Sequence, residues 1–417
     1  METAWIVAAR RTAFTRAGKG ALAAARPDDL LASLFRELLT AIPARCQDRL
    51  DEVVVGCAYP EAEQGRNAGR LVALHAGIPD RVPAMTLTRM CASSLEATAV
   101  ACAKVRLGEA RMVLVGGMES MSRIPIGGVK PSPNPALAER RPEATIGMGL
   151  TAERVAQRYQ VLRGDQDAWA LTSHRRAAAA RSRGVFAEEI LPIEVDGVSG
   201  PGTPAAAVAA SGPATGGADR PAAVAEAERA RILVAEDDAL RADTTLEKLA
   251  ALKPAFQEGG TVTAGNSCPT SDGASALLVA SGGVLRECGL APLGRFVSYA
   301  VAGVDPALMG IGPVHAVPVA LDRARLSLRQ IDRIELNEAF AAQALAVLRQ
   351  LGLPDDAEHV NPNGGAIALG HPLGATGARL VGTLLRELRR GGGRYGLATL
   401  CVGGGMGAAM VVENARP

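Results

Sequence analysis

The stretch Gly352-Leu-Pro-Asp355 nearly repeats an earlier stretch of the chain, Gly77-Ile-Pro-Asp80. Each copy is followed by a loop that ends in a reactive residue, Cys91 after the first copy and His371 after the second. In both places a helical segment, a glycine break and a strand running into a glycine-rich turn come next. Two similar halves of this kind would place Cys91 and His371 at equivalent helix N-termini that face each other. The repeat therefore predicts a molecule made of two halves of one design.

The rest of the chain alternates short apolar, β-branched runs with helical stretches rich in Ala, Leu and Arg. This alternation predicts an α/β architecture. Strands are expected at residues 5–8, 53–56, 112–115, 276–280, 331–336, 396–401 and 408–412. Helices are expected at about residues 28–40, 94–107, 152–159, 165–183, 339–350 and 378–390, with Asp165 as the N-cap of the fourth.

Residues 122–250 interrupt the repeat and are expected to form an insertion. Within it, residues 197–230 are rich in Ala, Gly, Pro and Ser and contain almost no large apolar residues. Such a segment cannot bury enough surface to order itself, so we expect a flexible surface loop there.

The composition excludes several classes of protein. Lys and Arg number 45 and Asp and Glu 43, and this net charge of +2 is too balanced for a nucleic-acid binder that neutralises phosphates. No run approaches ~18 consecutive apolar residues, so no membrane span is expected. The seven cysteines are spread along the chain without a CxxC pair, which predicts free thiols in a reducing compartment. With no secretory signal at the N-terminus, we expect a cytoplasmic protein.

Two short segments present a thiol or an imidazole at a helix start. Arg89-Met-Cys91-Ala-Ser-Ser94 places a cysteine just before a helix, whose dipole is expected to lower the pKa of the thiol. A small buried hydrophobic residue is the alternative interpretation of Cys91. The glycine-rich segment 364–377 leaves His371 free to act as a base or an oxyanion donor, although a structural loop histidine would look the same.

Two further segments lie at strand ends. Cys401-Val-Gly403-Gly-Gly405-Met-Gly407 places a thiol before glycines whose N–H groups can approach an anion. Its spacing is not GxGxxG, so a dinucleotide loop is a poor interpretation, whereas a plain tight turn stays open. Asn337-Glu-Ala-Phe340 lies where a strand ends and a helix begins, and helix capping is its alternative role.

Together the four segments resemble the thiolase family, in which a nucleophilic cysteine, Asn-Glu-Ala-Phe, Gly-His-Pro and Cys-x-Gly-Gly-Gly-x-Gly follow in this order. The resemblance covers nearly the whole chain apart from residues 197–230. It implies the thiolase fold, five αβαβα layers from two similar halves plus an inserted loop domain that binds CoA. The implied division is residues 1–121 with 270–291 for the N-terminal half, 122–269 for the inserted domain and 292–417 for the C-terminal half.

The resemblance also implies a reaction and the residues that perform it. Cys91 would attack the 3-keto carbonyl of a 3-ketoacyl-CoA after His371 takes its proton, and Cys401 would protonate the departing acetyl-CoA enolate. CoA, a co-substrate, would then attack the acyl-Cys91 thioester. His371 with a water on Asn337 would form one oxyanion hole, and the N–H groups of Cys91 and Gly403 a second. The reaction requires neither a metal nor a bound cofactor.

The resemblance further points to residues that contact the substrates. Arg241 stands where the family contacts the adenine or phosphates of CoA, Phe256 where it contacts pantetheine, and Cys268 near the CoA tail at a position that is usually Ser. Met148 is a further expected substrate contact. Gly147 stands where biosynthetic acetoacetyl-CoA thiolases tend to have a histidine that narrows the acyl pocket. This glycine therefore favours the bacterial degradative branch, the 3-ketoacyl-CoA thiolases of fatty-acid β-oxidation.

Three alternatives were weighed against this hypothesis. An acetoacetyl-CoA thiolase is disfavoured by Gly147, and a decarboxylating ketosynthase by Cys401, because ketosynthases pair one cysteine with two histidines or with His and Asn. A non-catalytic acyl-CoA-binding protein of the same fold is disfavoured because all four catalytic residues are present. The family is usually dimeric or tetrameric, so we expect a homodimer or homotetramer, and fatty-oxidation members can join a hydratase/dehydrogenase partner.

Overall fold

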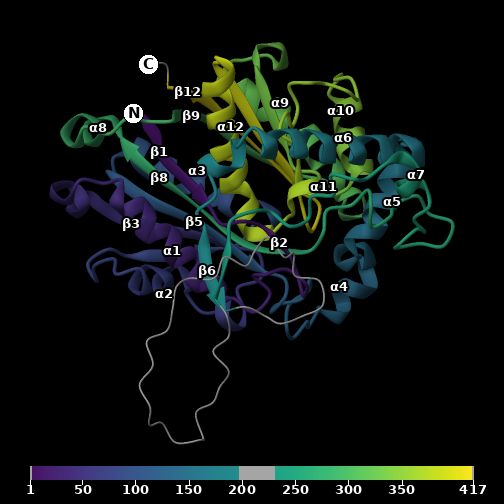
Figure 1. Cartoon of the computed structure of the whole chain (residues 1–417), viewed down its shortest axis with the longest axis horizontal. Helices are drawn as coiled ribbons and strands as arrows, with labels where there is room; N and C mark the ends of the chain where they lie inside the picture. Colours follow the sequence, from purple (N-terminus) through teal and green to yellow (C-terminus); the bar gives the residue numbers. More distant parts are fainter. Residues whose placement is uncertain (1, 197–230, 416–417) are drawn as a thin grey trace, which may run out of the picture.

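The computed structural model describes residues 2–196 and 231–415 (Figure 1). The flexible loop expected at residues 197–230 lies outside these ranges. Within them, none of the helices combines the length and the hydropathy that a membrane crossing requires.

The first half of the fold is built on five main strands. These are β1 (Ala4–Arg11), β3 (Leu50–Cys57), β4 (Ala84–Leu87), β5 (Met112–Ser120) and β8 (Ser271–Ser281), arranged in the order β1-β8-β5-β3-β4. β3 pairs in parallel with β4 and β5, whereas β8 pairs antiparallel with β5 and β1. Every residue of β5 and β8 is buried, so both read in the sequence as runs of apolar and small residues. The short β2 (Thr15–Arg16) pairs antiparallel with β8.

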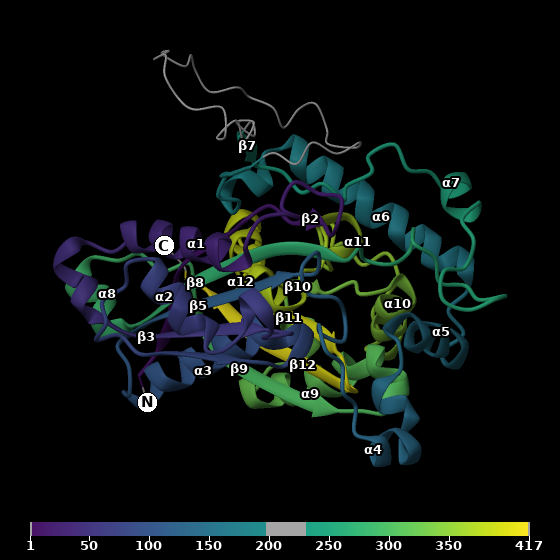
Figure 2. The same ribbon diagram turned by 90° about the horizontal axis from the view of Figure 1, so that it is seen from below.

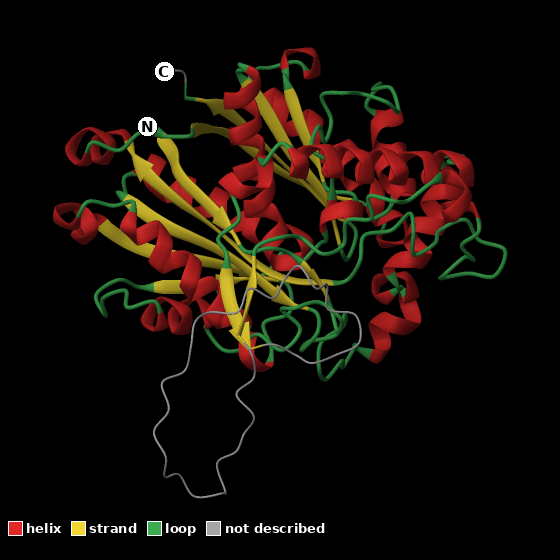
Figure 3. Cartoon of the chain, in the orientation of Figure 1, coloured by secondary structure: helices red, strands yellow, loops and turns green. Residues whose placement is uncertain are grey.

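The second half repeats this pairing pattern. Its strands are β9 (Gly294–Gly303), β10 (Arg333–Leu336), β11 (Tyr395–Val402) and β12 (Met406–Asn414), in the order β10-β11-β12-β9. The parallel pair β10-β11 corresponds to β3-β5, and the antiparallel pairs β11-β12 and β12-β9 correspond to β5-β8 and β8-β1. β1 and β9 pair at Trp5–Arg295, which joins the halves into one ten-stranded sheet (Figure 3). The predicted pair of similar halves is confirmed.

Helices form three layers around the two half-sheets. α3 (Ser93–Leu107) and α12 (Thr376–Gly391) pack on strands of both halves and form the central layer. α1 (Pro27–Thr40) and α2 (Ala68–His75) cover the outer face of the first half, and α9 (Gly312–Ala324), with α10 (Ala341–Gln350), covers that of the second. Successive β3 residues serve opposite faces, Val53 toward the α1 side and Val54 toward α3. The expected five-layered αβαβα stack is present (Figure 1, Figure 2).

The segment between β5 and β8 covers one side of the second half. It contains α4 (Pro135–Arg140), α5 (Met148–Arg158), α6 (Arg163–Ser182), β6 (Ile193–Asp196), β7 (Arg231–Val234) and α7 (Leu246–Ala250). α5 and α6 pack against α10, and α6 also contacts the short α11 (Ala366–Leu369). The predicted capping role of Asp165 is wrong, because α6 already begins at Arg163 and Asp165 lies within its first turn. The Asp165 carboxylate instead accepts a 2.7 Å hydrogen bond from Arg349.

All seven predicted strands and all six predicted helices are present. The strands β2, β4, β6, β7 and β9 and the helices α2, α4, α7, α8 (Gly282–Cys288), α9 and α11 were not predicted. Helix α9 shows why. It begins at Gly312-Pro313 and carries Pro318 inside, and these are turn signals in a sequence. Proline in the first turn removes no hydrogen bond, and packing of α9 on β9 and β12 stabilises the rest.

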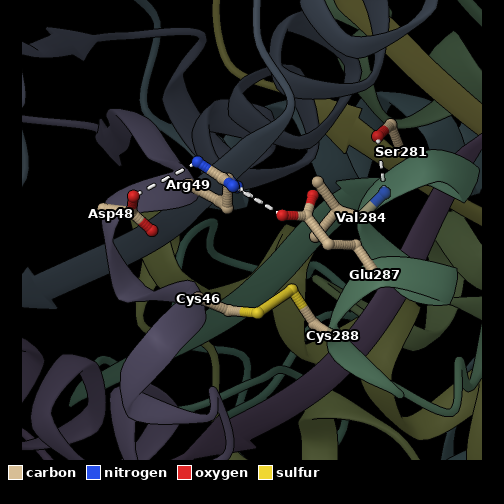
Figure 4. The surroundings of a disulfide bond; sticks show 7 residues. All are labelled: Cys46, Asp48, Arg49, Ser281, Val284, Glu287 and Cys288. Atoms are coloured by element: carbon tan, nitrogen blue, oxygen red, sulfur yellow. Dashed lines mark hydrogen bonds and ion pairs between the residues drawn. A yellow bond between two sulfur atoms is a disulfide. The ribbon is translucent and has the colours of Figure 1, made fainter.

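One pair of cysteines contradicts the expectation of free thiols. Cys46, in a 3-10 turn before β3, and Cys288, the last residue of α8, form a disulfide with Cα atoms 6.1 Å apart (Figure 4). Both are buried in the apolar cluster of the outer layer, beside an ion pair between Arg49 and Glu287. The two cysteines are separated by 242 residues, so their spacing in the sequence gave no sign of the contact. The other five cysteines are free.

Candidate active site

Cys91 lies in a short 3-10 turn, Met90–Ala92, between β4 and α3. Met90 has a φ of +46°, in the left-handed region that non-glycine residues rarely adopt. Backbone strain of this kind persists where the surrounding structure holds it, and it often marks functional sites. The Cys91 side chain is half-buried, so the turn presents the thiol to a ligand without exposing it fully.

The helix dipole does not control the Cys91 thiol as the sequence predicts. Burial raises the pKa of Cys91 to about 11, and the charge of Glu119 acts in the same direction. Backbone N–H groups of Gly403 and of Cys91 itself oppose this increase without reversing it. The predicted lowering of the pKa is therefore wrong, because loss of water outweighs the dipole. The resting residue is a thiol that needs a base before it can attack.

His371 is buried and oriented by hydrogen bonds on both ring nitrogens. Its Nδ1 lies 2.7 Å from Thr376 Oγ1, which itself donates to the Pro372 carbonyl at 2.9 Å. The hydroxyl therefore accepts from Nδ1–H, which leaves Nε2 with a free electron pair. Asn337 Nδ2 lies 3.3 Å from Nε2 and is placed to donate to it. Burial, together with the charge of Arg379, lowers the pKa of His371 to about 3, so the ring is neutral and able to take a proton.

Asn337 lies directly after β10 and is fully buried. Its backbone N–H donates to the carbonyl of Thr399 on β11 at 3.0 Å, which fixes the residue between the two strands. The side-chain Oδ1 has no hydrogen-bond partner among the described residues. A buried amide oxygen of this kind is a ready acceptor for a water or a ligand, because leaving it unpaired costs free energy.

Cys401 lies near the end of β11, where it is buried in an apolar cluster with Ala339, Phe340 and Met148. Burial raises the pKa of Cys401 well above its ordinary value, and the neighbouring thiols Cys91 and Cys268 raise it further. The three sulfur atoms thus share one electrostatic environment. Protonated Cys401 is suited to donate a proton.

Gly403 follows Cys401 and lies against the nucleophile turn. A Cβ added at Gly403 would lie 3.7–3.8 Å from atoms of Met90, which is an ordinary contact. Packing alone therefore does not require glycine here. The proximity of its N–H to the Cys91 sulfur is the feature that sets the position apart.

The N-termini of α3 and α12 meet, as the repeat predicts. Ser94 Oγ, in the first turn of α3, accepts a 2.9 Å hydrogen bond from the backbone N–H of Ala378 in α12. A Cβ on Gly377 would come within 2.2 Å of the Leu95 nitrogen, so the two helices touch through backbone at this point. Cys91 precedes the first helix and His371 the second.

Three of the four predicted substrate contacts lie around Asn337-Glu-Ala-Phe340. The Phe256 ring is partly exposed and packs edge-on against Phe340, with ring centres 5.9 Å apart. The backbone N–H of Cys268 donates to the Ala339 carbonyl at 3.1 Å, and Met148 contacts the cluster that holds Cys401.

The structure does not bring Arg241 to this group. Its backbone N–H donates to His174 on α6, and its exposed side chain lies near the same histidine.

Two residues of the site were not singled out from the sequence. Thr376 lies within the glycine-rich segment 364–377 that contains His371, and Glu119 lies near the end of β5. Thr376 orients His371, and Glu119 holds the loop that follows it. In residues 2–196 and 231–415, no group of three or more His, Cys, Asp or Glu side chains is arranged to hold a metal ion.

Comparisons with known proteins identify the family of the chain. The family model of the thiolase N-terminal domain matches residues 4–206 and 219–283, and that of the thiolase C-terminal domain matches residues 290–414. A 3-ketoacyl-CoA thiolase of Bacillus subtilis (strain 168) is 46% identical over 413 residues, covering 99% of this chain and 100% of the relative. A 3-oxoadipyl-CoA/3-oxo-5,6-dehydrosuberyl-CoA thiolase of Escherichia coli (strain K12) is 43% identical over 432 residues, with coverage of 99% and 100%. The crystal structure of human mitochondrial 3-ketoacyl-CoA thiolase in complex with CoA superimposes with a TM-score of 0.83 at 35% identity, covering 99% of this chain and 98% of that one.

Proposed function

The chain belongs to the thiolase family, and on that premise we propose that it is an acyltransferase that cleaves 3-ketoacyl-CoA with free CoA, releasing acetyl-CoA and a shortened acyl-CoA. The observation that carries the proposal is that the turn of Cys91, strained at Met90, and the loop of neutral His371 lead into helix N-termini that meet, with the second thiol Cys401 near Cys91. His371 Nε2 carries an electron pair, toward which Asn337 Nδ2 is placed to donate. One base and two thiols with separate roles are what a two-stage acyl transfer through a thioester requires.

In the first stage Cys91 becomes acylated. His371 Nε2 takes the Cys91 proton as the sulfur attacks the 3-keto carbon of the substrate. The bond between C2 and C3 then breaks, and its electron pair leaves with the acetyl-CoA enolate. Cys401 donates its proton to C2 of the enolate, which releases acetyl-CoA and leaves a thiolate on Cys401.

In the second stage the acyl group passes to CoA. The Cys401 thiolate takes the proton of the incoming CoA thiol, and the CoA sulfur attacks the acyl-Cys91 carbonyl. Cys91 leaves as a thiolate and recovers its proton from His371, which restores the starting state. The acyl group is a thioester both on Cys91 and on CoA, so its transfer from one sulfur to the other is nearly isoenergetic.

Two sets of donors are placed to stabilise the charge that develops on oxygen. Once His371 has taken a proton, its Nε2–H donates, together with a water held by Asn337 Oδ1, to one oxyanion. The backbone N–H groups of Cys91 and Gly403 serve the other. Removing one donor of such a pair typically costs about 10²–10³ in rate.

Gly147 supports a broad acyl pocket. It is the N-cap of α5, and an added Cβ would meet no atom within 4 Å. A histidine would therefore have room there, so packing does not exclude the residue that acetoacetyl-CoA thiolases tend to have, and the glycine favours the broader branch. We infer a substrate range beyond acetoacetyl-CoA, with CoA as co-substrate and no bound cofactor. A homodimer or homotetramer in the cytoplasm, with a hydratase/dehydrogenase partner, stays a prediction.

The proposal is tested by CoA-dependent cleavage of acetoacetyl-CoA, a long-chain 3-ketoacyl-CoA and 3-ketoadipyl-CoA, assayed side by side. We expect efficient cleavage of the long-chain substrate. Cleavage of acetoacetyl-CoA alone would assign the chain to the short-chain branch, and preference for 3-ketoadipyl-CoA would assign it to the reaction named for the Escherichia coli relative. No cleavage of any of them would favour a non-catalytic acyl-CoA-binding protein.

A further inference from the structure

The C-terminal end of β5 is the place where the two catalytic segments rest on the same strand. A Cβ on Gly117 would lie 2.5 Å from Cβ of Ser94 and 2.6 Å from the carbonyl oxygen of Gly374. Ser94 follows Cys91 by three residues, and Gly374 follows His371 by three. The segments that carry the nucleophile and the base therefore both pack against the same part of β5, which fixes the distance between them.

Glu119 is the acidic residue of β5 next to these contacts, and it is 1% exposed. Oε2 accepts from the backbone N–H of Ala58 at 2.8 Å and from that of Gly374 at 2.9 Å. Oε1 accepts from the Gln64 amide at 2.8 Å and from the backbone N–H of Tyr59 at 3.3 Å. The carboxylate thus ties the end of β3, in the first half, to the loop of His371, in the second.

Nothing in the packing suggests that Glu119 is present for stability alone. All of its hydrogen-bond donors among the described residues are neutral N–H groups, apart from the Cys57 thiol at 3.9 Å. Burial of a carboxylate without a cationic partner is costly, and the N–H donors only offset that cost. The four N–H contacts of Glu119 satisfy buried donors and so serve the fold, and the contact with Gly374 adds a hold on the loop of His371.

We propose that Glu119 is a positioning residue for the thiolase reaction, which clamps Gly374 and so holds His371 at a fixed approach to Cys91. The inference rests on the proposed function and deepens it. Gly374 is part of the clamp, because a Cβ there would lie 2.5 Å from the Met118 carbonyl oxygen and 2.8 Å from Glu119 Oε2. Only glycine allows the loop to approach the carboxylate this closely.

The charge of the clamp also reaches the nucleophile. Burial is the main cause of the raised pKa of Cys91, and the negative charge of Glu119 raises it further. The other titratable groups around Cys91 are Cys268, Cys401 and neutral His371, with Tyr59 nearby. Replacing Glu119 by glutamine removes the negative charge of the carboxylate and leaves all of these titratable groups in the chain.

The first test compares Glu119→Gln with Glu119→Asp in the full chain. For Glu119→Gln we expect kcat to fall about 10- to 100-fold with little change in KM, because a small misplacement of a catalytic group costs up to about 100-fold in rate. Alkylation of Cys91 by iodoacetamide should move to lower pH in Glu119→Gln. In Glu119→Asp, which keeps the charge, it should stay close to wild type while kcat is only partly restored. Unchanged kcat, or superimposable alkylation curves for Glu119→Gln and wild type, would overturn the proposal.

The second variant, Gly374→Ala, keeps the carboxylate but pushes the loop away from it. We expect a loss of kcat of similar size and no shift in the alkylation curve. Full activity of Gly374→Ala would overturn the proposal, and if Glu119→Gln does not fold, Gly374→Ala and Glu119→Asp decide. Failure of the wild type to cleave any 3-ketoacyl-CoA would remove the proposed function, whereas the alkylation comparison needs no substrate and still decides whether Glu119 acts on Cys91.

Discussion

Replacing Thr376 with valine removes the hydroxyl that orients His371, together with the hydrogen bond that this hydroxyl donates to the Pro372 carbonyl. Valine has nearly the same shape, and Thr376 is fully buried at the start of α12. The 2.7 Å contact with Nδ1 is lost, so the ring either buries an unpaired N–H or turns to the other tautomer. An unpaired buried donor costs about 1–3 kcal/mol. Since 1.36 kcal/mol corresponds to a tenfold change in rate, the expected loss of kcat is about 5- to 150-fold.

The assay is steady-state thiolysis of the best 3-ketoacyl-CoA, with a thermal melt of each variant as the folding control. Thr376→Ser retains the hydroxyl and should keep most of the wild-type kcat. The unpaired donor also costs the folded state, so the melting temperature of Thr376→Val should fall by about a few degrees. The variant then stays folded at the assay temperature, and its loss of kcat reports the orientation of His371. A Thr376→Val enzyme with the same kcat as Thr376→Ser would refute the reasoning that the Nδ1 contact prepares Nε2 to act as the base.

Three further predictions concern other parts of the molecule. Because burial and Arg379 lower the pKa of His371 to about 3, the pH profile of kcat/KM should show no loss of activity from a group titrating near 6.5, and such a group that disappears in a His371 variant would contradict this. Gly403→Ala keeps the backbone N–H and adds only ordinary contacts, so it should fold and keep most of the wild-type kcat. Gly403→Pro lacks that N–H and should lose about 10²–10³ in kcat; unimpaired turnover of Gly403→Pro would argue against the second oxyanion hole. Cys46→Ser should remove about 2–4 kcal/mol of stability with kcat unchanged, and melts under non-reducing conditions that match the wild type would show that the disulfide does not stabilise the fold.

Much of the fold is predictable because it is periodic. The repeat of Gly77–Asp80 at Gly352–Asp355 marks two copies of one unit, and β3-β5-β8 and β10-β11-β12 pair in the same way. Helix α9 is not predictable in this way. Pro313 and Pro318 indicate turns in the sequence, whereas in the structure packing on β9 and β12 stabilises the helix.

The site is predictable in its residue types but not in its energetics. The order of motifs predicts Cys91, His371 and Cys401 as site residues. In the structure the helices that follow Cys91 and His371 meet at their N-termini, and Cys401 lies near Cys91. The pKa of Cys91 is raised, whereas the helix dipole alone would lower it. The difference comes from burial, which depends on the tertiary structure and cannot be predicted from a local motif.

Contacts between distant parts of the chain are the least predictable. Glu119 and Gly374 are 255 residues apart, and Cys46 and Cys288 are 242 apart. Neither pair has a spacing that signals its contact.

The most direct test of the proposed chemistry is intact mass spectrometry of the enzyme after treatment with acetyl-CoA. The account predicts one added acetyl group in the wild type, located on Cys91 by peptide mapping. The adduct should be absent in Cys91→Ala and retained in Cys401→Ala, because Cys401 acts on the leaving group and on CoA and not as the acyl acceptor. An acetyl adduct that survives Cys91→Ala, or that maps to Cys268 or Cys401 in the wild type, would contradict the assignment of Cys91 as the nucleophile.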